Sequence, residues 1–286
     1  MTPPGWLDRR AYPFASRWAD VPGGRIHYVD EGGGPPVVMV HGAPTWSFLY
    51  RHLVAGLRGA YRCVAPDNLG FGLSERPRGV SYRPADQAAR LGALIETLGL
   101  KDFALVVHDF GGPIGLAHAV AHPEQVRALV LFNTWMWSLR DDPRAAWPAR
   151  ALASPLGRWL YHRRRFSVEV VWKRALADRR RYTPAVHAQY ARAADGPVTW
   201  AYAREVLASS DWYEDLWRRR DRLARLPALL VWGRKDPAFG RALERWRPVF
   251  ERAEIVELAD VGHAPPEERG PEVAAVVRRF LDGLAA

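Results

Sequence analysis

The stretch FALVVHDFGGPIG, residues 103–115, has the residue types and spacing needed for nucleophilic chemistry. It reads as an apolar strand that ends at Asp109 and turns through Gly111 and Gly112 into a helix. In such a turn, small neighbours let the backbone lift a nucleophile above the sheet, while backbone N–H groups at the helix start stabilise negative charge. A carboxylate there can displace a leaving group from carbon. Asp109 alone could equally be a helix cap, so partner residues must decide.

Two such partners follow the last two apolar runs of the chain. Asp236 stands in WGRKDPAF and His263 in LADVGHAPPE. Taken singly, Asp236 before Pro237 fits a simple turn, and His263 fits a packing or surface histidine. Together with Asp109 they supply a nucleophile, a base and an acid that orients the base, each placed after a predicted strand.

A further loop, HGAPTWSFLYR at residues 41–51, also follows an apolar run directly. We expect the backbone N–H groups of Ala43 and Phe110 to face a developing oxyanion. His41 is expected to form structural hydrogen bonds, because His263 already fills the role of base. The glycine-rich loop that begins at Asp67 lacks the phosphate-binding pattern, which argues against nucleotide binding.

The elements that must position these residues alternate between short apolar runs and helical patterns, as in a mostly parallel sheet with flanking helices. We predict strands at residues 25–29, 36–40, 62–65, 103–107, 128–132, 228–232 and 253–258. Helices are predicted at residues 46–57, 84–98, 113–121, 241–247 and 271–284.

Residues 134–226 break this alternation, because their apolar residues follow helical spacing and prolines interrupt the run. We therefore predict an α/β core made of residues 1–133 and 227–286, with residues 134–226 inserted as a helical cap between two strands.

The composition is that of a globular protein: 286 residues, 48% hydrophobic and 25% charged, with a net charge of +10. The predicted cap holds 19 Lys and Arg against 10 Asp and Glu, and eight of the 13 Trp residues. We expect its charges to face outward and its Trp side chains to turn inward to an apolar pocket. Arginine runs such as 163–165 come with no nucleic-acid motif, so no nucleic-acid partner is expected.

Cys63 is the single cysteine of the chain, which excludes internal disulfides and thiolate metal sites. The first residues contain no apolar leader, and no run approaches the roughly 18 apolar residues that span a bilayer. We expect a cytoplasmic protein with no membrane partner, no metal and no cofactor.

Taken together, HGAPTWSFLYR, APDNLGFGLSERP, VVHDFGGPIG, WGRKDPAF and VGHAPPEE resemble the haloalkane dehalogenase branch of the α/β-hydrolase superfamily. The resemblance covers nearly the whole chain, and the order nucleophile, acid, histidine is that of the superfamily. At the position of Val107, the related epoxide hydrolases usually have glycine, whereas dehalogenases tend to have valine, as this chain does.

This resemblance implies an α/β-hydrolase fold and a small apolar, halogenated substrate. Asp109 would displace halide and form an alkyl ester, which water cleaves with His263 as base and Asp236 holding its ring. The alternative position for the acid is Asn133, which cannot serve.

The resemblance does not extend to the side chains that hold the leaving halide. Dehalogenases hold the leaving halide with a Trp after the nucleophile and an Asn in the HGxP loop or a second Trp in the cap, whereas this chain has Phe110 and Ala43. Losing both donors would cost about 2–4 kcal/mol in the transition state. The candidate replacements, each of which could instead be a packing residue, are Trp135, Trp137, Trp172 and Trp200.

Three alternatives stay open. An epoxide hydrolase would need acidic O–H donors in the cap, for which Tyr161, Tyr182, Tyr190, Tyr202 and Tyr213 are available. A relative that cleaves β-lactones is the second. A non-catalytic ligand-binding protein on a hydrolase scaffold is the third, although it would have had no need to keep all three of Asp109, Asp236 and His263.

Overall fold

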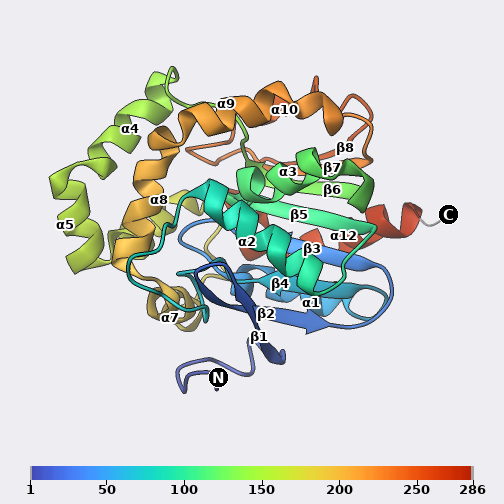
Figure 1. Ribbon diagram of the computed structural model, residues 1–286, viewed down its shortest axis with the longest axis horizontal. Helices are drawn as coiled ribbons and strands as arrows, with labels where there is room; N and C mark the ends of the chain where they lie inside the picture. The colour runs from blue at the N-terminus through green and yellow to red at the C-terminus, as the bar shows by residue number, and fades with distance from the viewer. Residues whose placement is uncertain (1, 285–286) are drawn as a thin grey trace.

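The computed structural model describes residues 2–284, which fold around one eight-stranded sheet (Figure 1). The strand order is β1-β2-β4-β3-β5-β6-β7-β8. The strands are β1 (Ser16–Val21), β2 (Gly24–Glu31), β3 (Pro36–Val40), β4 (Arg62–Pro66), β5 (Phe103–Asp109), β6 (Val126–Thr134), β7 (Ala228–Gly233) and β8 (Glu254–Leu258). The pairings β1–β2 and β2–β4 are antiparallel, and the other five are parallel.

Helices cover both faces of this sheet. The core helices are α1 (Arg51–Leu57), α2 (Pro84–Thr97), α3 (Gly111–Ala121), α10 (Leu243–Trp246), α11 (Pro265–Glu268) and α12 (Gly270–Gly283). Short 3₁₀ turns lie at Ser47–Tyr50, Pro123–Gln125 and Arg220–Arg222. Helices α2 and α3 pack side by side on one face, and α1 and α12 pack together on the other (Figure 1).

The central strands are apolar throughout because both of their faces are covered. In β5, Leu105 and Val107 belong to the hydrophobic cluster beneath α2 and α3, whereas Ala104 and Val106 belong to the cluster beneath α1 and α12. Successive side chains of a strand point to opposite faces, so one apolar run serves two cores. The carboxyl end of β5, where Asp109 lies, is held rigidly between them.

The strands predicted from apolar runs are all present, and two elements were missed. The sequence of β1, SRWADV, mixes polar and apolar residues without regular alternation at the edge of the sheet, where only Ala19 and Val21 are buried. Helix α11 is a single turn that begins with two prolines. Both are too short or too polar to give a periodic signal.

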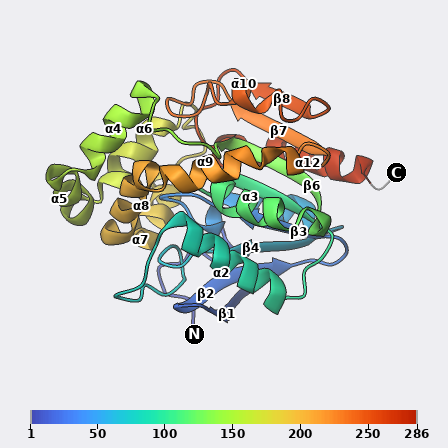
Figure 2. The same ribbon diagram turned by 45° about the horizontal axis from the view of Figure 1, so that its top comes forward.

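The segment between β6 and β7 contains only helices, as predicted. They are α4 (Pro143–Ala153), α5 (Pro155–Arg164), a π-helical turn (Ser167–Trp172) continued by α6 (Lys173–Ala175), α7 (Pro184–Ala193), α8 (Gly196–Ala208) and α9 (Ser210–Arg218). We call this stretch, which joins β6 to β7, the inserted segment. Two views show α4, α5, α7 and α8 gathered at one end of the sheet (Figures 1 and 2).

The arginines of the inserted segment face outward as expected, since all but Arg220 are exposed. The expectation that its Trp residues turn inward is wrong for two of the eight. Trp147 and Trp159 lie on the outer surface, because each stands on the side of its helix opposite the residues that pack inward. Among residues 2–284, no helix combines the length and the apolar character required to cross a membrane.

Candidate active site

Asp109 occupies a strained turn at the end of β5. Its φ angle is +51°, in the left-handed region that residues other than glycine rarely adopt. A Cβ atom on Gly111 would lie 1.9 Å from the carbonyl oxygen of Val40, and one on Gly112 would lie 1.7 Å from Oγ1 of Thr134. The Thr134 hydroxyl donates to the Asp109 carbonyl at 2.6 Å. The strain is thus maintained by close packing, as at a functional position.

Val107 stands where such turns usually have their first glycine, and Gly115 on helix α3 leaves room for its side chain. A Cβ atom on Gly115 would lie only 2.8 Å from Cγ1 of Val107. Gly115 therefore admits the larger side chain at Val107 and keeps the sharp turn possible.

The carboxylate of Asp109 meets the backbone of the HGAP loop. The N–H of Ala43 donates to Oδ1 of Asp109 at 2.8 Å. Gly42 is required beside it, because a Cβ atom there would lie 2.1 Å from the same oxygen. Phe110 directly precedes α3 as its N-cap residue. One carboxylate oxygen is thus held by a backbone donor, at the start of a helix.

The three predicted residues of the chemistry come together. Nε2 of His263 lies 3.4 Å from Oδ2 of Asp109, and Nδ1 of His263 lies 2.8 Å from Oδ2 of Asp236. All three side chains are buried. The imidazole thus lies between two carboxylates that are 127 positions apart in the sequence.

Asp236 is fixed from two further directions. It accepts hydrogen bonds from the backbone N–H of Ala238 at 2.8 Å and from the side-chain amide of Asn133 at 2.9 Å. Asn133 also bonds both backbone groups of Gly233. The sequence shows only that Asn133 cannot be the acid; the structure shows that it orients the acid.

The contacts of His263 determine its charge. Burial alone would lower the pKa of its imidazole, but the charge of Asp236 and the hydrogen bonds to both carboxylates outweigh burial and raise the pKa to about 10. For Asp236, burial would raise the pKa, but the charge of His263 and the hydrogen bond to it bring the pKa below its usual value. The resting site therefore holds an imidazolium at neutral pH.

His108 lies beside His263 and supports it, a role that no motif in the sequence indicates. Nε2 of His108 donates to the carbonyl of His263 at 2.9 Å, and the two ring centroids are 4.6 Å apart. Burial, followed by the positive charge of His263, lowers the pKa of His108 to about 4. His108 is therefore a neutral, structural neighbour of the base.

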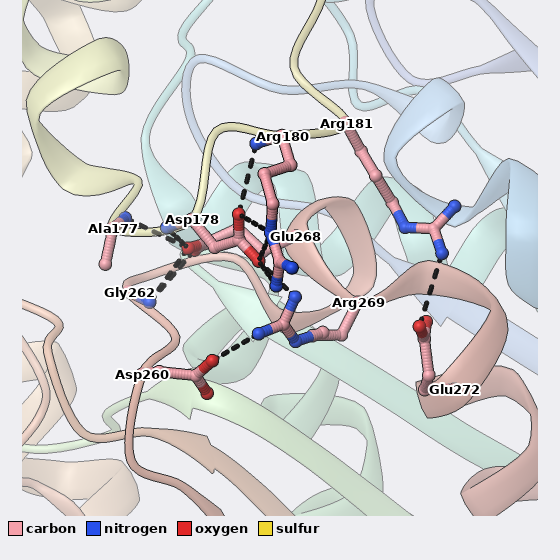
Figure 3. A network of polar contacts seen from close by, with 9 residues as sticks. All are labelled: Ala177, Asp178, Arg180, Arg181, Asp260, Gly262, Glu268, Arg269 and Glu272. Carbon is pink, nitrogen blue, oxygen red and sulfur yellow. Dashed lines mark hydrogen bonds and ion pairs between the residues drawn. The ribbon is translucent and has the colours of Figure 1, made fainter.

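The loop that carries His263 is also tied to the inserted segment by Glu268 (Figure 3). The carboxylate of Glu268 accepts the N–H groups of Gly262 and Ala264 on the loop, and those of Ala177 and Asp178 on the inserted segment, at 2.7–3.1 Å. The N–H of His263 itself donates to the carbonyl of Ala175 at 2.9 Å. One buried carboxylate thus holds both segments together.

Ion pairs surround this junction at the surface. Arg269 pairs with Asp178 of the inserted segment and with Asp260 of the loop, and Arg181 pairs with Glu272 at 3.2 Å (Figure 3). The pairs Arg269–Asp260 and Arg181–Glu272 involve exposed carboxylates and contribute little individually, whereas the Arg269–Asp178 pair is largely buried. Glu268 and the Arg269–Asp178 pair therefore both attach the loop to the inserted segment.

Of the four Trp residues predicted to bind halide or substrate, only two lie near the candidate active site. Trp135 packs against Phe110, with ring centroids 4.8 Å apart, and Trp172 lies 6.3 Å from the ring of His263. The indole N–H groups of both are buried and have no hydrogen-bond partner among the described residues. Trp135 thus lies beside Phe110, the neighbour of Asp109, and Trp172 lies near His263.

Trp137 and Trp200 have different surroundings. Trp137 belongs to an aromatic cluster with Trp217 and Trp246. Trp200 packs beside His162, and the guanidinium groups of Arg158 and Arg204 lie over its ring. Neither is brought beside Asp109 or His263.

The tyrosines considered as acids for epoxide opening are mostly engaged elsewhere. Tyr182 bonds His187, Tyr190 donates to Glu267 and Tyr213 donates to the carbonyl of Glu205. Tyr202 is the one that packs against Phe110, with ring centroids 4.8 Å apart. Among residues 2–284, none of these tyrosine hydroxyls forms a hydrogen bond to the Asp109 carboxylate.

His41 bonds backbone groups and none of the three reactive side chains, as expected for a structural residue. One ring nitrogen donates to the carbonyl of Gly42 at 2.7 Å, and the other accepts the N–H of Asn68 at 2.8 Å. Burial lowers the pKa of His41. Within the part of the chain that the structure covers, no group of three or more His, Cys, Asp or Glu side chains could hold a metal ion.

The sheet, the strained turn and the order of the three residues define an α/β hydrolase. The family profile described as alpha/beta hydrolase fold matches residues 35–269. Haloalkane dehalogenase 2 of Mycobacterium tuberculosis is 39% identical over 96% of this chain and 97% of that protein. The chain belongs to the haloalkane dehalogenase branch of this superfamily.

Two further similarities refine this assignment. The crystal structure of haloalkane dehalogenase DbeA from Bradyrhizobium elkani matches with a TM-score of 0.82 at 26% identity, over 94% of this chain and 99% of that one. A Shewanella oneidensis protein named cis-3-alkyl-4-alkyloxetan-2-one decarboxylase is 33% identical over 94% of this chain and 89% of its own length. Proteins similar to this chain are thus named for two different substrates.

Proposed function

We propose that this protein hydrolyses carbon–halogen bonds of small apolar molecules through a covalent ester on Asp109, with His263 and Asp236 as base and orienting acid. The observation that carries the proposal is the placement of His263 between the two carboxylates, beside a nucleophile held at a positive φ angle. No cofactor is needed for this reaction, because water is the only co-substrate.

In the first step, Oδ2 of Asp109 attacks the carbon and the halide leaves with the bonding electron pair. Oδ2 is the suitable oxygen, because Oδ1 is occupied by the N–H of Ala43 at 2.8 Å. Oδ1 then becomes the carbonyl oxygen of the ester. The N–H of Ala43, joined by that of Phe110, stabilises the negative charge on Oδ1 when water attacks.

The second step requires a neutral His263. In the resting protein two carboxylates raise its pKa to about 10. Esterification of Asp109 removes one of these charges, so the pKa of His263 falls. The imidazole can then take a proton from the water that attacks the ester carbonyl carbon, while Asp236 stabilises the imidazolium that forms. The bond between that carbon and the alkyl oxygen then breaks, the alcohol leaves with the proton from His263, and the Asp109 carboxylate is regenerated. Formation of the ester thus lowers the pKa of His263, which lets His263 act as the base in ester hydrolysis.

For the departing halide, we propose the indole N–H groups of Trp135 and Trp172 as donors in place of side chains at Ala43 and Phe110. Both indole N–H groups are buried without a hydrogen-bond partner among the described residues, Trp135 beside Phe110 and Trp172 near His263. We also propose that residues 134–226 act as the cap over the site, and that the core comprises residues 1–133 and 227–286. The single, buried Cys63 suits a reducing cytoplasm.

A second candidate substrate is a β-lactone, favoured by the absent halide donors at Ala43 and Phe110. Attack of Asp109 on the alkyl carbon of the ring would break a C–O bond and release a carboxylate, which needs no halide site. The 33% identical relative from Shewanella oneidensis is named for such a ring.

These proposals are separated by product analysis with the wild-type protein. We expect bromide release from 1-bromobutane and loss of at least about 10³-fold of that rate in Asp109→Asn, because the amide is a poor nucleophile. Carbon dioxide or a hydroxy acid from a cis-dialkyl β-lactone would instead support the second candidate. Diol from styrene oxide, or bromide release unaffected by Asp109→Asn, would contradict the proposed reaction.

A further inference from the structure

The large apolar side chains exposed in the described part of the chain all lie on two adjacent helices of the inserted segment. Trp147 on α4 is 72% exposed, and Leu156 and Trp159 on α5 are 66% and 53% exposed. Single exposed apolar residues are ordinary, but three within 13 positions, two of them Trp, indicate a binding surface. We call Trp147, Leu156 and Trp159 the apolar face.

The same two helices carry unbalanced positive charge. Residues 143–164 contain no Asp or Glu and five arginines, all of them exposed: Arg144, Arg150, Arg158, Arg163 and Arg164. Elsewhere in the inserted segment some arginines have carboxylate partners, as in the pairs Arg140–Asp211 and Arg219–Asp215, while others such as Arg218 and Arg225 are unpaired within the described residues but stand in stretches that also contain Asp or Glu. Among residues 2–284 none of the five arginines forms an ion pair.

Trp and Arg together identify the chemistry of the partner. Trp side chains favour the boundary between lipid headgroups and acyl chains. Each Arg or Lys near an anionic bilayer adds about 1 kcal/mol of attraction. Helices with Trp and Leu among arginines lie in the plane of this boundary. We propose that α4 and α5 bind reversibly to the surface of bilayers that contain anionic lipid.

The position of the two helices suits a flat partner. Helices α4 and α5 pack on each other and on α8, at the outer edge of the molecule in both views (Figures 1 and 2). A second copy of the chain fits less well, because a symmetric pairing of this surface would bring two sets of five arginines together. This inference replaces the expectation of no membrane partner and does not depend on the proposed reaction.

The test is flotation of the full-length protein with vesicles of phosphatidylcholine, with and without about 30% phosphatidylglycerol. We expect binding to the anionic vesicles only, and weaker binding as salt rises. Arg150→Gln/Arg163→Gln/Arg164→Gln should weaken the partition coefficient by about 100-fold, at tenfold per 1.4 kcal/mol. Trp147→Ala/Trp159→Ala should weaken it by at least about tenfold.

A matched control removes three exposed, unpaired arginines elsewhere, in Arg218→Gln/Arg225→Gln/Arg252→Gln, and should leave binding within about twofold of wild type. Circular dichroism and hydrolysis of a soluble substrate check that each variant is folded. Equal binding to both kinds of vesicle, or equal loss in the control, would overturn the proposal. So would a dimer in solution that Trp147→Ala/Trp159→Ala dissociates, since it would assign the surface to a second copy.

Discussion

At the residue scale, the two carboxylates beside His263 set the charge of its imidazole. Asp236 and Asp109 together raise its pKa to about 10. Asp236→Asn removes the largest stabilising charge, so we expect the pKa of His263 to fall towards its ordinary value near 6.5. The measurement is an NMR titration of the imidazole Cε1–H, with Asp215→Asn as an exposed control that leaves the pKa unchanged.

The same pair makes stability depend on pH. A histidine whose pKa is raised on folding stabilises the folded state below the unfolded pKa of about 6.5, and this contribution is lost as pH rises through about 10. The free energy of unfolding of wild type should therefore exceed that of Asp236→Asn by the most below pH 6.5, and the difference should shrink towards pH 10. A difference that grows with pH would contradict the assigned charge.

Residues with a chemical signature can be found from sequence, and residues whose partners are brought near only by the fold cannot. Asp109, His263 and Asp236 follow recognisable strands and glycines. His108 and Asn133 have no such signature, because their partners are a carbonyl 155 positions away and a carboxylate 103 positions away. Only the fold reveals that these two residues hold the base and the acid.

At the scale of elements, the junction between the His263 loop and the inserted segment depends on Glu268. Glu268→Ala would leave four backbone N–H groups without their acceptor, each at a cost of about 1–3 kcal/mol if unsatisfied. We expect a loss of several kcal/mol in the free energy of unfolding, measured by urea denaturation. Because the His263 loop would shift, kcat should also fall by at least about tenfold.

The matched control is Glu272→Gln, which breaks only the exposed pair with Arg181. It should change the free energy of unfolding by less than about 1 kcal/mol and leave kcat unaltered. Equal effects of the two substitutions would show that Glu268 does not position the loop.

The elements themselves follow closely from sequence periodicity wherever a face is buried. Strands such as β5 and β7 are apolar because helices cover both sides, and this made them predictable. Edge strand β1 is partly polar and α11 is a single turn, so neither has an apolar pattern that can be recognised in the sequence. The helical content of the inserted segment was predictable, but how its helices meet the His263 loop was not, because that contact is made by backbone N–H groups.

At the scale of the whole molecule, the net charge of +10 is concentrated in one segment of the chain. Nearly all of it belongs to residues 134–226, and an unpaired group of five arginines lies on α4 and α5. Composition predicted the outward arginines but not the outward Trp147 and Trp159. Their exposure depends on which side of each helix packs against α8, and this geometry is set by the tertiary structure.

The most direct test of the central claim, a covalent ester on Asp109, is intact-protein and peptide mass spectrometry of His263→Gln after incubation with 1-bromobutane. Without its base, the variant should complete the first step only. We expect one butyl group per chain, located on Asp109, with release of about one equivalent of bromide. Absence of the adduct, its location on another residue, or its persistence in Asp109→Asn/His263→Gln would contradict a covalent ester on Asp109.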